Sequence, residues 1–197
     1  SVTDKASVAN LLELGVEPDR ITLGADWAWL HPATGECDEW AAGVWNSLGI
    51  DPARPVLVIN ASGDAGSELA AALDILHKDD GFQLAFLCLD CRHPGLHRSV
   101  VELVQSFLQA PSVLVPNEFY SPAELISLLR PATVTLTRHQ PLAIAAVLAG
   151  TLPFLLSGTA GGPIVSPELG FPPYGVPGPF QADSFLPAFR EALATRP

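Results

Sequence analysis

The sequence is poor in positive charge. It has 10 Lys and Arg residues against 21 Asp and Glu residues, which gives a formal net charge of −11 at pH 7. Proteins that bind nucleic acid take much of their affinity from basic side chains, and anionic lipid surfaces attract basic segments. The charge balance therefore excludes nucleic acid as an expected partner and disfavours electrostatic docking on a membrane.

Methionine is absent and cysteine is scarce. A chain that opens Ser1-Val2-Thr3 and contains no methionine predicts either a processed start or a piece of a longer protein. Cys37, Cys88 and Cys91 are too few, and odd in number, for a disulfide scaffold. They favour a reducing compartment, so we expect a cytoplasmic protein.

Long hydrophobic runs are also missing. The longest, residues 142–156, is shorter than the roughly 20 apolar residues of a membrane span and is broken by Gly150 and Pro153. Residues 1–10 contain Asp4 and lack the apolar stretch of a signal peptide. We therefore expect neither a transmembrane segment nor a secretion signal.

Apolar residues are plentiful enough for a large core. They make up 48% of the 197 residues, and charged residues only 16%, so we expect one folded domain rather than disorder. Short apolar runs alternate with helical periodicity, which predicts an α/β fold: a doubly wound, mostly parallel Rossmann-like sheet with helices on both faces. The expected strands are residues 56–59, 83–89, 112–115, 133–137 and 153–156.

The two ends of the chain depart from this alternation. Residues 1–50 predict a helical segment that packs on the domain formed by residues 51–197. Residues 157–182 are rich in proline and glycine and predict an irregular crossing before a C-terminal helix.

Local signals place the helices. Gly15 and Gly49 predict the ends of the first two. Ser121 followed by Glu124 predicts a capping box. One expected helix starts after Asp4 and one starts near residue 121. The others span about residues 37–48, 67–77, 95–108, 141–149 and 183–194. In the helix of residues 95–108 we expect four side chains to point inward, those of Leu96, Val100, Leu103 and Phe107.

The expected sheet defines where a ligand binds. In open α/β sheets, ligands bind beyond the carboxyl ends of the strands, where the strand order reverses. In the usual order, strands 56–59 and 133–137 are neighbours at that point, so the loops that follow them face the same site. These are residues 60–67 and 138–140.

The first of these loops is small, contains glycine and opens a helix. Backbone amides in such a loop hold anions, so we predict contacts to an anionic donor from Asn60, Ser62 and Gly63. The alternative is a tight turn between strand and helix that binds nothing.

The second loop holds Arg138 and His139 between an apolar strand and an apolar helix. A guanidinium offers a forked donor set for a carboxylate or phosphate, and an imidazole exchanges a proton near neutral pH. We predict that both residues are catalytic and that Arg138 also contacts the donor. The alternative is that Arg138 pairs with a carboxylate to cap the sheet and that His139 is a solvated residue at the helix start.

Residues 88–97 include two cysteines and two histidines, which are zinc-binding residue types. The spacer between the Cys pair and the His pair is too short for a zinc-finger site, so we expect no metal. We expect Cys88 to point into the core, and Arg92 to line the rim of the site as a further donor contact.

Several segments, in order along almost the whole chain, resemble the C-terminal half of polysaccharide pyruvyl transferases. Residues 4–16 are similar to the R-D-x-x-S and L-x-x-x-G-V elements of that family, and residues 22–30 to its D-P-A-F element. Residues 121–129 resemble its S-x-x-E-L-x-x-L-I helix. Residues 135–156 resemble its S-R-L-H-A-x-I-x-A-L-x-A-G-V-P stretch.

The resemblance implies a Rossmann-like domain of a glycosyltransferase B-type enzyme that works without a cofactor. Its reaction would be ketal transfer of pyruvate from phosphoenolpyruvate to a lipid-linked sugar acceptor in cell-envelope or exopolysaccharide synthesis, at the inner face of the membrane. Arg138 would then hold the donor and His139 would protonate its enol carbon. An N-terminal Rossmann-like domain would supply the other wall of the cleft.

The chain departs from the family pattern at the candidate site. It has Arg138-His139-Gln140 where the family has Arg-Leu-His, and either Arg138 or His139 fits the position of the family's Arg. The altered motif and the net charge of −11 favour a rival hypothesis, a non-catalytic structural or partner-binding module. A third hypothesis is the C-terminal domain of a nucleotide-sugar glycosyltransferase, with Asp64 or Glu168 near a ribose.

Overall fold

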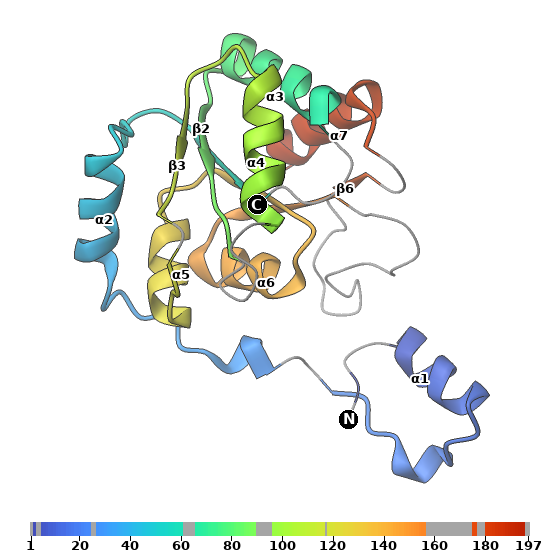
Figure 1. Ribbon diagram of the computed structural model, residues 1–197. Coiled ribbons are helices and arrows are strands. Elements are labelled where there is room, and N and C mark those ends of the chain that lie inside the picture. The colour runs from blue at the N-terminus through green and yellow to red at the C-terminus, as the bar shows by residue number, and fades with distance from the viewer. Residues whose placement is uncertain are drawn as a thin grey trace.

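The computed structural model describes residues 2, 5–24, 27–60, 66–89, 96–116, 118–156, 175–176 and 180–195. Within this part of the chain, six parallel strands form one sheet in the order β3-β2-β1-β4-β5-β6 (Figure 1). The predicted α/β fold is confirmed. The strands are β1 (Val56–Asn60), β2 (Gln83–Phe86), β3 (Ser112–Leu114), β4 (Val134–Thr137), β5 (Leu152–Leu156) and β6 (Gly175–Val176).

Strand β1 lies where the strand order reverses. It pairs in parallel with β2 on one side, where Ile59 lies opposite Phe86. On the other side it pairs in parallel with β4, where Asn60 lies opposite Thr137. The predicted adjacency of the first and fourth strands is therefore confirmed, and their carboxyl ends meet at one edge of the sheet.

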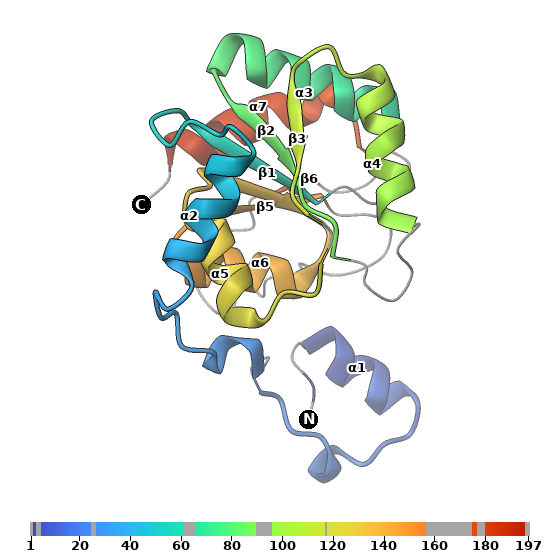
Figure 2. The ribbon, with the colours of Figure 1, turned by 60° about the vertical axis from the view of Figure 1, so that its left-hand side comes forward.

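Helices cover both faces of the sheet (Figures 1 and 2). On one face lie α3, α4 and α7, and on the other lie α2, α5 and α6. This two-sided cover is what a doubly wound fold requires. The helices are α1 (Lys5–Glu13), α2 (Asp38–Ser47), α3 (Gly66–Asp80), α4 (Leu96–Phe107), α5 (Pro122–Leu129), α6 (Gln140–Ala149) and α7 (Ala182–Ala194), with short 3₁₀ turns η1 (Pro18–Arg20) and η2 (Trp27–Leu30).

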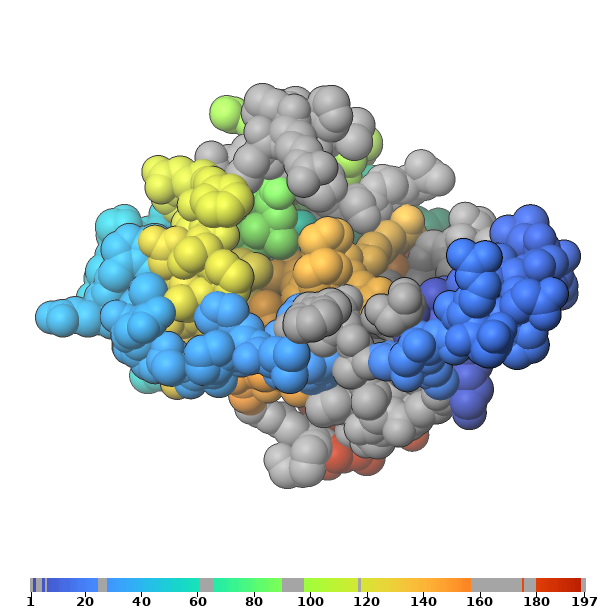
Figure 3. Space-filling model, turned by 90° about the horizontal axis from the view of Figure 1, so that it is seen from below, coloured from blue at the N-terminus to red at the C-terminus, as the bar shows by residue number. Residues whose placement is uncertain are grey.

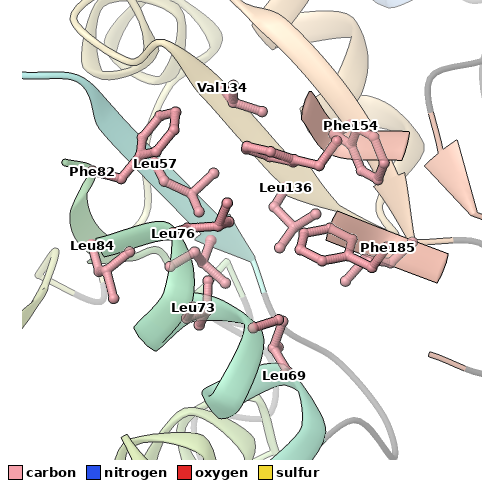
Figure 4. Close-up of a cluster of buried hydrophobic side chains, with 14 of the residues drawn as sticks. Leu57, Leu69, Leu73, Leu76, Phe82, Leu84, Val134, Leu136, Phe154 and Phe185 are labelled. Atoms are coloured by element: carbon pink, nitrogen blue, oxygen red, sulfur yellow. The ribbon is translucent and has the colours of Figure 1, made fainter. Parts of the chain in front are cut away.

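The continuous apolar run of β1 reflects burial on both of its faces. Leu57 and Ile59 belong to the core under α3 and α7, which Figure 4 shows in part. Val56 and Val58 belong to the core under α2, α5 and α6. Successive side chains of a strand point to opposite faces, so all of these positions must be apolar.

The inward face of α4 agrees with the prediction only in part. Val100, expected inside, is partly buried and packs against the core under α3 and α7. Leu103 and Phe107, expected inside, are about half exposed, whereas Val101 and Val104 are buried. Two neighbouring stripes of this helix are apolar, and α4 packs beside α3 near the end of the sheet. The stripe that faces α3 and the sheet together is the one that became buried.

The crossing after β5 contains a strand that the sequence did not predict. Gly175–Val176 pairs in parallel with Leu155 and Leu156 as β6. A Cβ atom at Gly175 would clash with the carbonyl oxygen of Leu155, so glycine is what lets the backbones approach here. Most of residues 157–182 lie outside the described residues.

The predicted helix ends are confirmed. Gly15 has φ +83°, and its N–H and that of Val16 bond back to the last turn of α1, as in a Schellman motif. Gly49, with φ +72°, follows α2. The N-terminus of α5 has both reciprocal bonds of the predicted capping box between Ser121 and Glu124. The cap predicted at Asp4 lies outside the described residues.

The first 50 residues contact the domain through α2, through η2 and through the carbonyls of Ala33 and Thr34, which accept hydrogen bonds from Arg130. α2 packs on α5, and η2 lies against α6, whereas α1 lies apart from the sheet (Figures 1 and 2). Figure 3 shows the N-terminal segment across this end of the molecule, with α1 at one side and α2 at the other. An open hollow of about 400 Å³ lies between α1 and residues 18–23. The domain boundary predicted at residue 50 stays a prediction.

None of the helices in the described ranges is both long enough and apolar enough to cross a bilayer.

Candidate functional site

The residues predicted from β1 and β4 meet at the carboxyl edge of the sheet. Asn60 ends β1, Thr137 ends β4, and Arg138 and His139 connect β4 to α6. The topology therefore brings Asn60, Arg138 and His139 to one place. The other predicted donor contacts, Ser62, Gly63 and Arg92, lie outside the described residues.

Asn60 is held by hydrogen bonds within the protein. Its side chain is 2% exposed. Its Nδ2 donates to the carbonyl oxygen of Leu87 at 2.9 Å, and its Oδ1 accepts from Oγ1 of Thr137 at 3.1 Å. The amide thus joins the ends of β1, β4 and the segment after β2. The donor contact predicted for Asn60 stays a prediction.

Thr137 extends this network to the start of α6. Its Oγ1 accepts a hydrogen bond of 2.8 Å from the backbone N–H of His139. The hydroxyl therefore donates to Asn60 and accepts from His139, and it is completely buried. Sequence reasoning missed Thr137 because a threonine at the end of a buried strand has no motif of its own; its position directly before Arg138-His139 was the available signal.

Arg138 is half-buried at the same edge. Its Nε is buried, and within the described residues it has no hydrogen-bond partner. No carboxylate from those residues forms an ion pair with it, whereas Arg130 and Arg190 have partners in Asp38 and Asp80. Buried donors in proteins are nearly always paired, so this nitrogen is suited to a ligand that supplies an acceptor.

His139 occupies the N-cap position of α6. Its side chain is exposed and makes no capping hydrogen bond. Pro141, at the second helical position, has no N–H, so the first turn presents the N–H groups of Gln140 and Leu142. The positive end of the helix dipole points to the same edge as Arg138. The arrangement is suited to a small anionic group.

The structure places Cys88 in the core, as predicted, with 1% exposure. Burial raises the pKa of its thiol, which suits a structural rather than a reactive cysteine. Cys91 and His93 lie outside the described residues. Among the residues that are described, no group of three metal-binding side chains occurs.

Comparison with known proteins defines the class of the fold. No model of a known protein family matches the sequence, and no curated protein does. Solved structures do match. A glycosyl transferase family 9 protein from Veillonella parvula has a TM-score of 0.61 at 12% identity over 98% of this chain and 61% of its own. A glycosyltransferase from Rickettsia africae has a TM-score of 0.66 at 17% identity over 98% of this chain and 52% of its own.

A third similar structure is UDP-GlcNAc 2-epimerase from Neisseria meningitidis bound to UDP-GlcNAc. It has a TM-score of 0.56 at 13% identity, over 97% of this chain and 51% of its own. The chain therefore has the Rossmann-like fold of glycosyltransferase B-type proteins, which confirms the fold implied by the pyruvyl transferase resemblance. It spans between about half and three-fifths of the length of these proteins.

Proposed function

We propose that this chain is the donor-binding domain of a sugar-modifying transferase, and that it holds a phosphate of a nucleotide-sugar donor beside Arg138. The observation that carries the proposal is the buried Nε of Arg138. It has no hydrogen-bond partner among the described residues and lies at the edge where β1 and β4 end. Ligands of open α/β sheets bind at this place.

Because the molecule is strongly acidic, a site for an anionic donor needs a positively charged group close to the donor. A net charge of −11 opposes an anionic donor at long range, but at physiological ionic strength charges are screened beyond about 8 Å. Within that distance a guanidinium and the N-terminus of α6 dominate. An Arg also binds phosphate with two parallel hydrogen bonds. Arg138 is thus the residue on which affinity for the donor depends.

The fold favours a nucleotide sugar over phosphoenolpyruvate, the donor that the pyruvyl transferase resemblance implies. Two of the similar structures are glycosyltransferases, and the third holds UDP-GlcNAc. Each matches nearly the whole of this chain. Asp64 and Glu168, the residues predicted to contact a ribose, lie outside the described residues.

His139 supplies acid–base chemistry in this proposal. Its imidazole is exposed, and the residue follows Arg138 directly at the same edge of the sheet. A protonated imidazole stabilises the negative charge that develops on a phosphate oxygen as the bond between that oxygen and the sugar of the donor breaks.

Because the chain spans little more than half of the length of its structural neighbours, we propose that a second Rossmann-like domain supplies the sugar acceptor side of the cleft.

The proposal is tested by calorimetric titration of the 197-residue chain with UDP, ADP, GDP, phosphoenolpyruvate and inorganic phosphate. We expect at least one nucleoside diphosphate to bind, and Arg138→Ala to weaken its binding at least tenfold. Arg54→Ala is the matched control. It removes the same charge, but Arg54 lies before β1 at the opposite edge and bonds to the carbonyl of Gly81, so binding should be unchanged.

The panel separates the hypotheses. Binding of phosphoenolpyruvate alone would favour pyruvyl transfer over glycosyl transfer. Binding of none of the five compounds would overturn the transferase proposal and favour a non-catalytic module. Equal losses in the Arg138→Ala and Arg54→Ala variants would show that net charge, and not this site, determines binding.

A further inference from the structure

We infer that Asn60 and Thr137 are positioning residues, which hold Arg138 and His139 in the geometry that binds the donor. This inference rests on the proposed function. The two side chains form one continuous chain of hydrogen bonds from the carbonyl of Leu87 to the backbone N–H of His139.

The direction of every hydrogen bond in this chain is fixed. A carbonyl such as that of Leu87 only accepts, so it must face the Nδ2 of Asn60. The Oδ1 of Asn60 then faces Thr137 and accepts its single hydroxyl proton. The oxygen of that hydroxyl is left to accept the N–H of His139. Flipping the amide would put donor against donor, so one arrangement is strongly preferred.

Within the described residues, the network continues the backbone pairing of the sheet. The N–H of Leu87 bonds to the carbonyl of Ile59 at 2.9 Å. One residue further along β1, the side chain of Asn60 bridges to the carbonyl of Leu87 and to Thr137. These side-chain bonds form a row at the edge where the candidate site lies.

Arg138 lies between the two ends that this network fixes. Its preceding residue, Thr137, is buried and bonded at the side chain, and its following residue, His139, is bonded at the backbone N–H. The backbone of Arg138 is therefore held on both sides. A binding group must be held within about 0.5 Å of its productive position, and loss of the Thr137 hydroxyl releases one side.

The strand itself offers a matched control. Thr135 is on β4, two residues before Thr137, and is equally buried. Its hydroxyl interacts with that of Thr151 at 3.4 Å, away from the carboxyl edge. Replacing either threonine by valine keeps the shape and removes one buried hydroxyl. Only Thr137→Val breaks the connection to His139.

The experiment compares Thr137→Val, Thr137→Ser and Thr135→Val. The probe is whichever nucleoside diphosphate of the UDP, ADP and GDP panel binds the wild-type chain most tightly. We expect Thr137→Val to weaken binding on the order of tenfold or more, because the backbone of Arg138 is then held on one side only. Thr137→Ser, which keeps the hydroxyl, should restore most of the affinity. Thr135→Val should lower the melting temperature without changing the affinity.

Hydrogen exchange at the His139 amide gives a second readout that needs no ligand. Thr137→Val should speed exchange of that amide relative to both Thr135→Val and Thr137→Ser. If the wild-type chain binds no diphosphate, the proposed function fails, and positioning is then judged by exchange alone. Unchanged exchange at His139 in Thr137→Val overturns the inference in either case, as does equal affinity of the two valine variants for a diphosphate that binds the wild type.

Discussion

The indole Nε1 of Trp45 donates a hydrogen bond of 3.0 Å to the backbone carbonyl of Leu128, across 83 residues of sequence. Leu128 lies in the last turn of α5, where carbonyl groups have no partner within the helix. Trp45, which lies in α2, therefore provides a hydrogen-bond donor for a carbonyl at the end of α5. This bond links α2 to the domain.

We predict that Trp45→Phe lowers the free energy of unfolding by about 1–3 kcal/mol, because a buried carbonyl loses its partner. Urea denaturation followed by circular dichroism measures this without depending on the lost indole. Trp40→Phe is the control. Trp40 is partly exposed and packs against the ring of Tyr120, so its replacement should cost less. A larger cost at Trp40 would contradict the role given to Trp45.

The capping box of α5 makes stability depend on pH in acid. The bond of 2.7 Å that the N–H of Ser121 donates to Glu124 lowers the pKa of that carboxyl. A lowered pKa stabilises the fold above the unfolded value of about 4.3, and this stabilisation is lost as the pH falls through the folded value. The stability gap between the wild type and Glu124→Gln should therefore be constant near pH 7 and shrink in acid.

Denaturation series between pH 2.5 and 7 measure that gap. Glu191→Gln, on the exposed side of α7, is the control and should show a smaller gap at pH 7. Ser121→Ala, which removes the cap itself, should cost about 1 kcal/mol. A gap for Glu124→Gln that widened in acid would have the wrong sign for this mechanism.

Neighbouring residues on the two apolar stripes of α4 should differ in how much they contribute to stability. Val104 is buried and Leu103 is about half exposed. Val104→Ala should cost about 2 kcal/mol, from two lost methyl groups and the cavity they leave. Leu103→Ala removes a larger side chain but should cost less. Thermal unfolding of the two variants measures both costs. A larger cost for Leu103→Ala than for Val104→Ala would contradict the orientation of α4 in the structure and favour the one predicted from the sequence.

The two described cysteines should differ in reactivity. Cys88 is buried, whereas Cys37 is only partly buried. The pKa of both thiols is raised, so the difference in exposure is what separates them. We expect iodoacetamide at pH 8 to modify Cys37 in the folded protein and Cys88 only after unfolding, as peptide mass analysis would show. Equal rates at the two residues would contradict the burial of Cys88.

The sheet could be predicted because its signals are local. The apolar runs around Val58 and Leu136 and the helices between them give a parallel fold, and one rule of chain connection then makes β1 and β4 neighbours. The capping box at Ser121 is likewise contained in four residues. In each case the residues that carry the signal are the residues that form the structure.

What the sequence did not predict depends on distant contacts. Packing on α3 determines which side of α4 is buried. Val101 and Leu103 are both apolar residues, so the sequence alone does not show which of them is buried. β6 has two residues, and its pairing depends on glycine at position 175, where a Cβ atom would clash with the carbonyl oxygen of Leu155. The role of Thr137 depends on Asn60 lying opposite it, which no local pattern of β4 contains.

The bond between Asn60 and Thr137 joins residues 77 positions apart in the chain. Loops of that size close slowly, and contacts of high sequence separation form late in folding. The first three strands with α3 and α4 are able to assemble before β4 arrives, but they contain only half of the network. The proposed binding site therefore requires β4 to dock beside β1, and a chain cut between α4 and β4 would lack Thr137, Arg138 and His139.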